Sequence, residues 1–109
     1  MGPVNWGNLK KTKAREGVFR SVVSGQKVMM VMNEIQPSAE PFPHSHSQEQ
    51  ILHITKGRAE VGVGDKTWIL GPGDVIVVPP NVPHVLKVVG NEPVINIDVF
   101  SPIREDYLK

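Results

Sequence analysis

The sequence predicts an all-β sandwich or barrel, and three observations carry that prediction. Strand-like segments recur at intervals of about ten residues, with turn residues between them. No segment keeps the apolar period of an amphipathic helix. Ten Gly and ten Pro among 109 residues suit short strands joined by tight turns, and this length fits a single domain.

The expected strands are rich in β-branched and aliphatic residues and stop at Gly, Pro or Asn. In chain order they cover residues 18–24, 27–35, 50–55, 58–63, 67–70, 75–78, 85–89 and 94–100. The Gly-Pro-Gly-Asp run at 71–74 is a strong turn signal, because proline presets φ and glycine can take positive φ. The chain therefore divides into an N-terminal arm (1–17), a β-barrel (18–101) and a C-terminal tail (102–109).

The arm carries a basic cluster formed by Lys10, Lys11, Lys13 and Arg15. We expect a solvated arm, and the alternative is a patch that attracts phosphate or uronate groups. Trp6 is expected to anchor the arm to the body of the protein or to a second subunit. The tail is expected to form one short helical turn.

Net charge and composition argue against several classes of function. The formal charge of +1 gives no bulk electrostatic argument for binding nucleic acid or membranes. No apolar run approaches the length of a membrane span, and Met1 is not followed by a signal-peptide pattern. The absence of Cys excludes disulfides, thiolate ligands and a cysteine nucleophile. We expect a cytoplasmic protein with no nucleic-acid or membrane partner.

Histidines gather in two short segments that also hold other donor atoms. His44 and His46 stand two residues apart, so on extended backbone their side chains leave the same face. Gln50 follows one short step later and offers a carbonyl oxygen, and His84 comes after the proline-rich segment 79–83. Because imidazole nitrogens and an amide oxygen suit Zn, Ni, Cu, Fe or Mn, these four residues are candidate ligands of one divalent transition metal.

The neutral side chain at position 50 has an electrostatic consequence. Imidazoles and an amide leave a divalent ion its full charge, so the site should favour a small anionic or chelating oxygen ligand. Four protein ligands in an octahedral shell would leave positions open for water or substrate. If a local bulge reverses the strand, Glu49 replaces Gln50 as the ligand. His53 lies on the opposite face from Gln50 and is expected to be packed or exposed rather than to bind the metal.

The first of these segments resembles the first motif of the cupins, G-x5-H-x-H-x(3,4)-E-x6-G. Here the pattern reads His44-x-His46, three residues, Gln50, six residues and Gly57. Gln takes the place of Glu, and the leading glycine of the motif is missing.

The second segment resembles the second cupin motif, G-x5-P-x-G-x2-H-x3-N. It begins with Gly73 and, five residues later, Pro79. Asn81 then stands where the motif has glycine, His84 matches the histidine, and Val88 stands where Asn is usual.

The resemblance covers residues 18–100 in strand pattern and implies a small barrel of two antiparallel sheets, a double-stranded β-helix or jelly roll. It also implies a metal inside one end of the barrel. The residues carried over as ligands are His44, His46, Gln50 and His84.

A narrower resemblance is to the small cupins of the pectin-degradation, KdgF-like group. It rests on the H-S-H-x-x-E-Q form at 44–50 and on residues 98–107, which match D-x-F-S-P-x-R-x-D-[YF]. Members of that group are implicated in converting 4,5-unsaturated galacturonate to its linear keto form. By this resemblance Asp98, Phe100 and Arg104 would sit near the metal. The chemistry of such a substrate would suit Asp98 for moving protons and Arg104 for pairing with a carboxylate, and Phe100 is expected to be a pocket wall or a core residue. The alternative for Asp98 and Arg104 is a mutual salt bridge that ties the tail down.

The leading hypothesis is a metal-dependent enzyme that acts on a small, anionic sugar acid without redox change. The alternatives are a metal-dependent dioxygenase or lyase for another small organic acid, a non-catalytic binding or sensor module, and a metal-free barrel that holds a ligand. Apolar residues on both faces of the expected strands 27–35 and 94–100 predict a homodimer.

Overall fold

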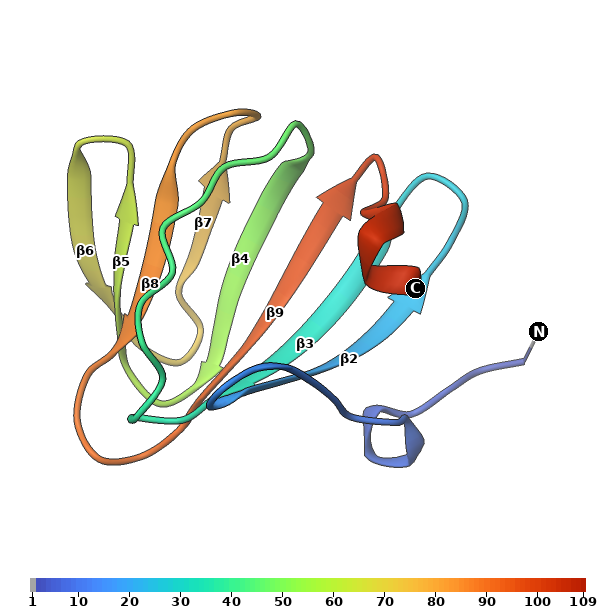
Figure 1. The fold of residues 1–109 in the computed structure, drawn as a ribbon, viewed down its shortest axis with the longest axis horizontal. Coiled ribbons are helices and arrows are strands. Elements are labelled where there is room, and N and C mark those ends of the chain that lie inside the picture. The colour runs from blue at the N-terminus through green and yellow to red at the C-terminus, as the bar shows by residue number, and fades with distance from the viewer. Residues whose placement is uncertain (1) are drawn as a thin grey trace.

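The strands pair into two antiparallel sheets in the computed structural model, which describes residues 2–109 (Figure 1). One sheet has six strands in the order β1-β2-β3-β9-β4-β7, and the other has three in the order β6-β5-β8. The elements in chain order are η1 (Trp6–Asn8), β1 (Thr12–Arg15), β2 (Val18–Ser24), β3 (Met29–Ile35), β4 (Glu49–Lys56), β5 (Ala59–Val63), β6 (Lys66–Leu70), β7 (Val75–Val78), β8 (His84–Val88), β9 (Val94–Ser101) and η2 (Glu105–Leu108).

The all-β prediction is confirmed, and each of the eight expected strands is present to within about two residues at either end. The one helical turn expected in the tail is also present, as the 3₁₀ turn η2. Along the described residues 2–109, no helix is both long and apolar enough to cross a membrane.

The N-terminal segment is more ordered than a solvated arm. Thr12–Arg15 form β1, which pairs antiparallel with β2 and extends the larger sheet. Lys11 and Lys13 form exposed ion pairs with Glu34 and Glu16, at 3.3 and 2.6 Å. Exposed pairs of this kind add little stability, so the pairing of β1 with β2 is what orders the segment. Trp6 is half-buried.

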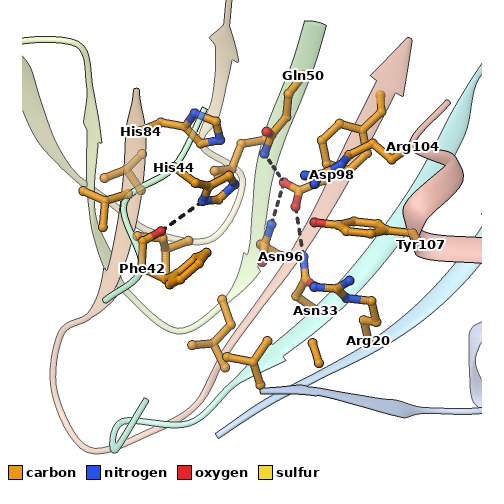
Figure 2. A pocket seen from close by; sticks show the side chains of 18 of the residues that line it. Arg20, Asn33, Phe42, His44, Gln50, His84, Asn96, Asp98, Arg104 and Tyr107 are labelled. Carbon is orange, nitrogen blue, oxygen red and sulfur yellow. Dashed lines mark hydrogen bonds between the residues drawn. The ribbon is translucent and has the colours of Figure 1, made fainter. Parts of the chain in front are cut away.

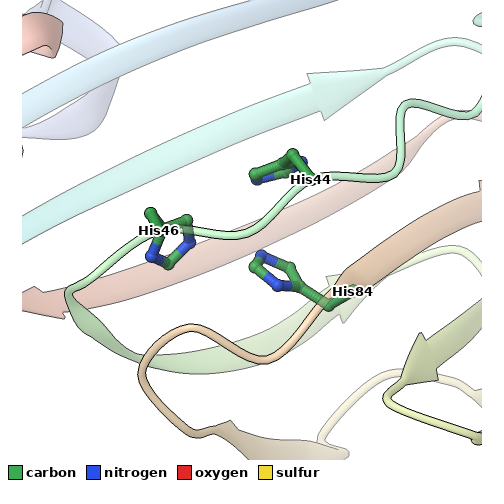
Figure 3. Close-up of side chains that lie close together, drawn as sticks. All are labelled: His44, His46 and His84. Carbon is green, nitrogen blue, oxygen red and sulfur yellow. The ribbon is translucent and has the colours of Figure 1, made fainter.

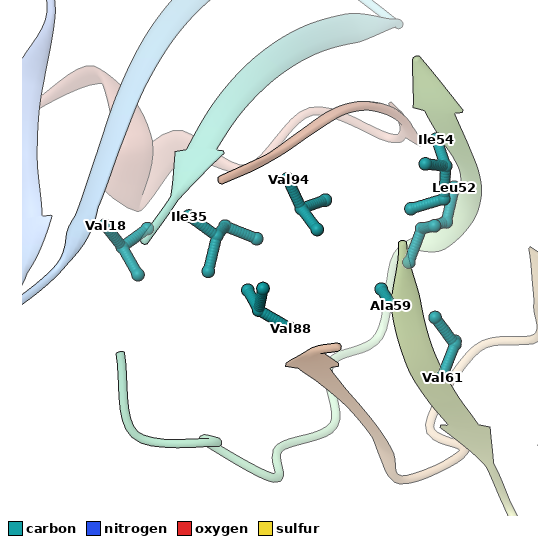
Figure 4. Packing of buried hydrophobic residues seen from close by; sticks show 8 residues of the cluster. All are labelled: Val18, Ile35, Leu52, Ile54, Ala59, Val61, Val88 and Val94. Carbon is teal, nitrogen blue, oxygen red and sulfur yellow. The ribbon is translucent and has the colours of Figure 1, made fainter. Parts of the chain in front are cut away.

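The main hydrophobic core fills one end of the space between the two sheets (Figure 4). Its buried members come from five strands and from the start of β9, and they are Val18, Ile35, Leu52, Ile54, Ala59, Val61, Val88 and Val94. Gly57 turns the chain beside this core with φ +80°, and a Cβ there would lie 2.5 Å from the carbonyl oxygen of Pro93. Only glycine fits both the backbone conformation and the space, which explains the glycine that closes the first motif.

A second, smaller apolar cluster lies farther along the inner face of the large sheet. It consists of Met29, Val31 and Phe100, and the tail packs Ile103 and Tyr107 against it. The inner face between the two clusters is polar rather than apolar.

The strand register aligns this polar region across the sheet. Arg20 of β2 is paired with Asn33 of β3, and Asn33 is paired with Asn96 of β9. Asp98 follows on the same face of β9, and Gln50 of β4 lies one row farther on, opposite Phe100. We call Arg20, Asn33, Gln50, Asn96 and Asp98 the polar band. The fold thus directs a row of hydrogen-bonding side chains into the space between the sheets.

Candidate metal centre and pocket

The two histidine segments are joined through their backbones. His44 and His84 form an isolated antiparallel bridge with N–H···O distances of 3.1 and 2.9 Å. The N–H of Asn81 also donates to the carbonyl of His46 at 2.7 Å. Asn81 has φ +65°, a conformation that Asn tolerates better than most residues, and so it can take the place of the motif's glycine. Residues 40 positions apart are therefore held at one end of the barrel.

The three histidine side chains converge (Figure 3). The ring centroids of His44 and His46 lie 4.5 and 4.8 Å from that of His84, and the candidate ligand atoms of all three lie within 4.8 Å of one another. These three residues could hold a metal ion. This arrangement agrees with the placement that the sequence predicted for residue 84.

Backbone carbonyls fix how each imidazole presents its nitrogens. Nδ1 of His44 lies 2.9 Å from the carbonyl oxygen of Phe42, Nδ1 of His46 lies 3.1 Å from that of Gln48, and Nδ1 of His84 lies 2.9 Å from that of Val82. A carbonyl can only accept, so each Nδ1 carries the proton. Each Nε2 is left with its lone pair free, which is the tautomer that a metal requires.

Gln50 presents its carbonyl oxygen to the same point. Its Nε2 donates to Oδ1 of Asp98 at 2.8 Å, and this bond fixes the orientation of the amide (Figure 2). Oε1 then lies 3.0 Å from Nε2 of His46. The carbonyl of Gln48 sets the tautomer of His46, so Nε2 of His46 and Oε1 of Gln50 both present lone pairs. Two lone pairs do not attract each other, whereas both can bind the same cation.

The donor set fits a divalent transition metal. Nitrogen and oxygen ligands bound at about 2.1 Å lie about 3 Å apart when they are adjacent in one shell, which matches the contact between His46 and Gln50. Nε2 of His84 is buried and has no hydrogen-bond partner among the described residues, so a cation would satisfy it. Burial lowers the pKa of both His46 and His84 and favours their neutral, metal-binding form.

The structure places the other two candidates for this role away from the cluster. Glu49 is exposed, while Gln50 is only 4 % exposed and points inward, so no bulge exchanges the two side chains. His53 lies on the opposite face of β4, where it is paired with Ile97 and Val75.

Asp98 is the buried carboxylate at the centre of the polar band. Its Oδ1 accepts from Gln50 and from Asn96 at 2.8 Å each, and its Oδ2 accepts from Asn33 at 2.9 Å. Burial raises the pKa of Asp98 to about 6, although these hydrogen bonds and the cations Arg104 and Arg20 act in the opposite direction. The carboxyl group therefore titrates near neutral pH.

Arg104 and Phe100 line the same pocket as Asp98. Arg104 does not form the alternative salt bridge with Asp98: over residues 2–109, its ion pair is with Asp106, at 3.1 Å. The ring of Phe100 lies edge-on to His46 at 5.4 Å and to Tyr107 at 5.8 Å. Phe100 thus lies between His46 and the tail, where it belongs to the smaller apolar cluster and also lines the cavity.

One cavity of about 460 Å³ is lined by His44, Gln50, His84, Asp98, Phe100 and Arg104. Arg15, which belongs to the basic cluster of the N-terminal segment, lines it as well, whereas sequence reasoning missed Arg20, Asn33, Phe42 and Asn96. Polar residues on strands are usually solvent-facing, so the pattern gave no signal for the buried amides. The one usable signal was Arg20, which shares the inward face of β2 with the core residue Val18.

Fold and site together define a small jelly-roll protein with a histidine cluster at one end of its cavity. The family model for the cupin domain matches residues 31–100, and the chain belongs to the cupin family.

Among solved structures, an RmlC-like cupin from Shewanella frigidimarina is similar with a TM-score of 0.88 and 28 % identity, over 95 % of this chain and 93 % of that one. KdgF from a Halomonas species is similar with a TM-score of 0.86 and 27 % identity, over 94 % of this chain and 96 % of that one. An uncharacterised protein of Methanocaldococcus jannaschii is 26 % identical over 80 residues, which cover 72 % of this chain and 64 % of the relative's length.

Proposed function

We propose that this protein is a metal-dependent enzyme that opens and ketonises the ring of an unsaturated sugar acid without redox change. The observation that carries the proposal is that one cavity unites a neutral metal-donor cluster, a single buried carboxylate and an arginine. The similarity to KdgF along most of both chains supports the substrate class, together with the sequence match to the KdgF-like tail.

The donor cluster would hold one divalent ion through His44, His46, His84 and Gln50, with Zn, Ni, Mn, Fe and Cu all compatible with these atoms. Such an ion supplies Lewis acidity to a bound carboxylate or neighbouring oxygen. Because all four donors are neutral, nothing in the cluster offsets attraction to an anionic substrate.

Asp98 would move a proton in the reaction. Gln50 and Asn96 both donate to Oδ1, whereas Oδ2 accepts from Asn33 alone, and Asp98 belongs to the lining of the cavity. Proton exchange with a substrate carbon or ring oxygen would therefore occur at Oδ2. Arg104 would pair with the carboxylate of the substrate through its guanidinium.

An absorbance assay tests the proposal, because the conjugated double bond of 4,5-unsaturated galacturonate absorbs ultraviolet light. The protein, loaded in turn with each of the compatible metals, should speed the loss of this absorbance, and removal of the metal by a chelator should abolish the effect. If no metal gives acceleration, the proposal fails. Oxygen uptake or release of CO₂ would instead support the dioxygenase or lyase alternative.

We also propose a homodimer formed through the outer face of the larger sheet. The register places Val77, Ile51, Val99 and Met30 in one continuous apolar row across β7, β4, β9 and β3. Val77 and Ile51 are 52 and 39 % exposed, and a continuous exposed apolar row, unlike apolar side chains scattered singly, marks a candidate interface. A second copy related by a twofold axis would cover this row with its own.

Sedimentation equilibrium tests the dimer. The unmodified protein should sediment with twice the chain mass, and Ile51→Glu should give the monomer. Ile69→Glu, a matched change of an exposed residue on the other sheet, should leave the dimer intact. A monomeric unmodified protein would refute the proposal.

A further inference from the structure

Tyr107 is sandwiched between two arginines on the side of the cavity away from the histidine cluster (Figure 2). The Cζ atom of Arg20 lies 3.8 Å from the ring centroid of Tyr107, and that of Arg104 lies 4.1 Å from it. Figure 2 shows the two guanidinium groups on opposite sides of the ring. Arg20 comes from β2, whereas Arg104 and Tyr107 come from the tail, so the stack joins distant parts of the chain.

Both guanidinium groups keep unused hydrogen-bond donors. Nε of Arg20 and Nη1 of Arg104 are buried without a partner among residues 2–109. Arg104 has one ion pair, through Nη2 to the exposed carboxylate of Asp106, whereas Arg20 forms none within the same residues. Buried donors of a charged group are costly unless an acceptor meets them.

The buried carboxylate of Asp98 does not supply that acceptor. Asp98 interacts electrostatically with both arginines, but its hydrogen bonds are formed with Gln50, Asn96 and Asn33. The stacked ring of Tyr107 attracts both cations through its faces and offers them no acceptor there. Two positive side chains that line the cavity are therefore held on opposite faces of one ring, without a carboxylate between them.

We infer that Arg20 and Arg104, held apart by Tyr107, form a carboxylate subsite that is separate from the histidine cluster. The ligand that fits is a sugar acid whose carboxylate accepts from both guanidinium groups while its other oxygens reach toward the histidines. This inference rests on the proposed function only in taking the ligand to be a sugar acid. It assigns to Arg20, a residue outside the cupin motifs, a direct contact with that ligand.

The subsite sets the orientation of the ligand. Asp98 lies between the arginines and Gln50, to which it is hydrogen-bonded (Figure 2). A molecule that spans the two ends of the cavity must pass over Asp98. The arginine subsite would thus place the middle of the sugar acid, rather than its carboxylate, against the proton-carrying group.

Binding to the metal-free protein tests the subsite without depending on catalysis. Galacturonate is the probe and uncharged galactose is its matched control, with the arginine Nε–H signals followed by ¹H–¹⁵N NMR. Galacturonate should shift the Nε–H signals of Arg20 and Arg104 and leave that of the exposed Arg58 in place. Galactose should shift none of them. Equal shifts with both sugars, or none with galacturonate, would overturn the inference.

Variants separate charge from geometry. Arg20→Gln should weaken galacturonate binding about ten- to a hundredfold, since it removes a charge-assisted pair. Arg20→Lys should restore part of the affinity because it keeps the charge and loses the planar fork. Arg58→Gln is the matched control and should bind like the unmodified protein. If Arg20→Gln binds as tightly as the control while its backbone spectrum remains folded, the inference is wrong.

The same variants distinguish this inference from the proposed function. In the metal-loaded protein, Arg20→Gln should raise KM for unsaturated galacturonate more than it lowers kcat. If no turnover occurs but galacturonate still shifts the Arg20 signal, the subsite stands and the enzymatic proposal fails. If turnover occurs and Arg20→Gln leaves KM unchanged, the enzymatic proposal stands and the subsite fails.

Discussion

The two ends of the space between the sheets are built from opposite chemistry. One end holds the main core, in which Ile54, Ala59 and Val94 are completely buried and no polar group intervenes (Figure 4). The other end holds the histidine cluster and the polar band, in which a carboxylate and several amides are also largely shielded from solvent. Both ends lie on the same strands, since Val94 and Asp98 are four residues apart on the inner face of β9.

This difference separates stability from chemistry. The apolar end gains free energy by removing hydrocarbon from water, and its buried members carry no ionisable or metal-binding side chain. The polar end buries a carboxylate, and it leaves Nε2 of His84 and Nε of Arg20 without partners. Buried polar groups without partners lower the free energy of unfolding. Their presence at this end therefore indicates a place where a ligand satisfies them.

The largest effect on the reaction rate is expected from a substitution of Asp98. Asp98→Asn keeps an acceptor for the Gln50 amide but cannot exchange a proton, so the rate on unsaturated galacturonate should fall about 10²- to 10⁴-fold. Metal content, measured by elemental analysis, should stay the same. An unchanged rate would show that Asp98 takes no part in the reaction. A loss of metal would show that Asp98 only supports the metal ligands.

His84→Ala should impair metal binding at the polar end and leave the main hydrophobic core intact. Loss of a direct ligand should weaken metal binding by more than about 100-fold, the upper range for residues that only support a ligand. The metal-free variant should lose little stability, because Nε2 has no partner to leave behind and Nδ1 has only the carbonyl of Val82. Isothermal titration with the metal and thermal unfolding measure the two effects, and a large loss of metal-free stability would contradict the separation.

Ile54→Ala should destabilise the main hydrophobic core and leave metal binding intact. Ile54 is fully buried, so its truncation should lower the free energy of unfolding by about 2–5 kcal/mol, as measured by urea denaturation. At a temperature where the variant remains folded, metal stoichiometry should not change. A loss of metal in the folded variant would show that the two ends are coupled.

The sequence predicts the apolar end far better than the polar one. Strand positions followed from turn residues and β-branched runs, and Gly57 follows from a turn that leaves no room for a side chain. The strand β1 was missed because Thr-Lys-Ala-Arg has no strand pattern of its own, and pairing with β2 orders it. Along β9, the apolar residues Ile95 and Ile97 alternate with Asn96, which would normally place Asn96 in solvent. In the folded protein Asn96 is instead buried, 1 % exposed, between the two sheets.

Much of the candidate site required the tertiary fold. His44, His46 and His84 were recognised from spacing, and the structure brings them together. The partners that fix their tautomers are backbone carbonyls, which carry no sequence signal. The stacking of Arg20 on Tyr107 joins β2 to the tail and depends on how the tail folds back across the sheet.

The pH dependence of stability should show a smaller effect of the same carboxylate. Burial raises the pKa of Asp98 to about 6 in the folded protein from an ordinary value near 3.8, so the folded state holds the proton that the unfolded state has lost between these values. The free energy of unfolding of the metal-free protein, relative to that of Asp98→Asn, should therefore fall by about 1–3 kcal/mol as the pH rises from 4 to 6. Urea titrations at several pH values measure this difference, and parallel curves would contradict the raised pKa.

The central claim is that three imidazoles and the amide oxygen of Gln50 converge on one cation. Elemental analysis of the protein after dialysis against each candidate metal, alongside Gln50→Ala, tests it most directly. The account predicts one divalent ion per chain in the unmodified protein and a lower metal content in the variant, since a direct ligand is lost. A protein that binds no divalent ion, or a variant that binds it as tightly as the unmodified chain, would contradict the account.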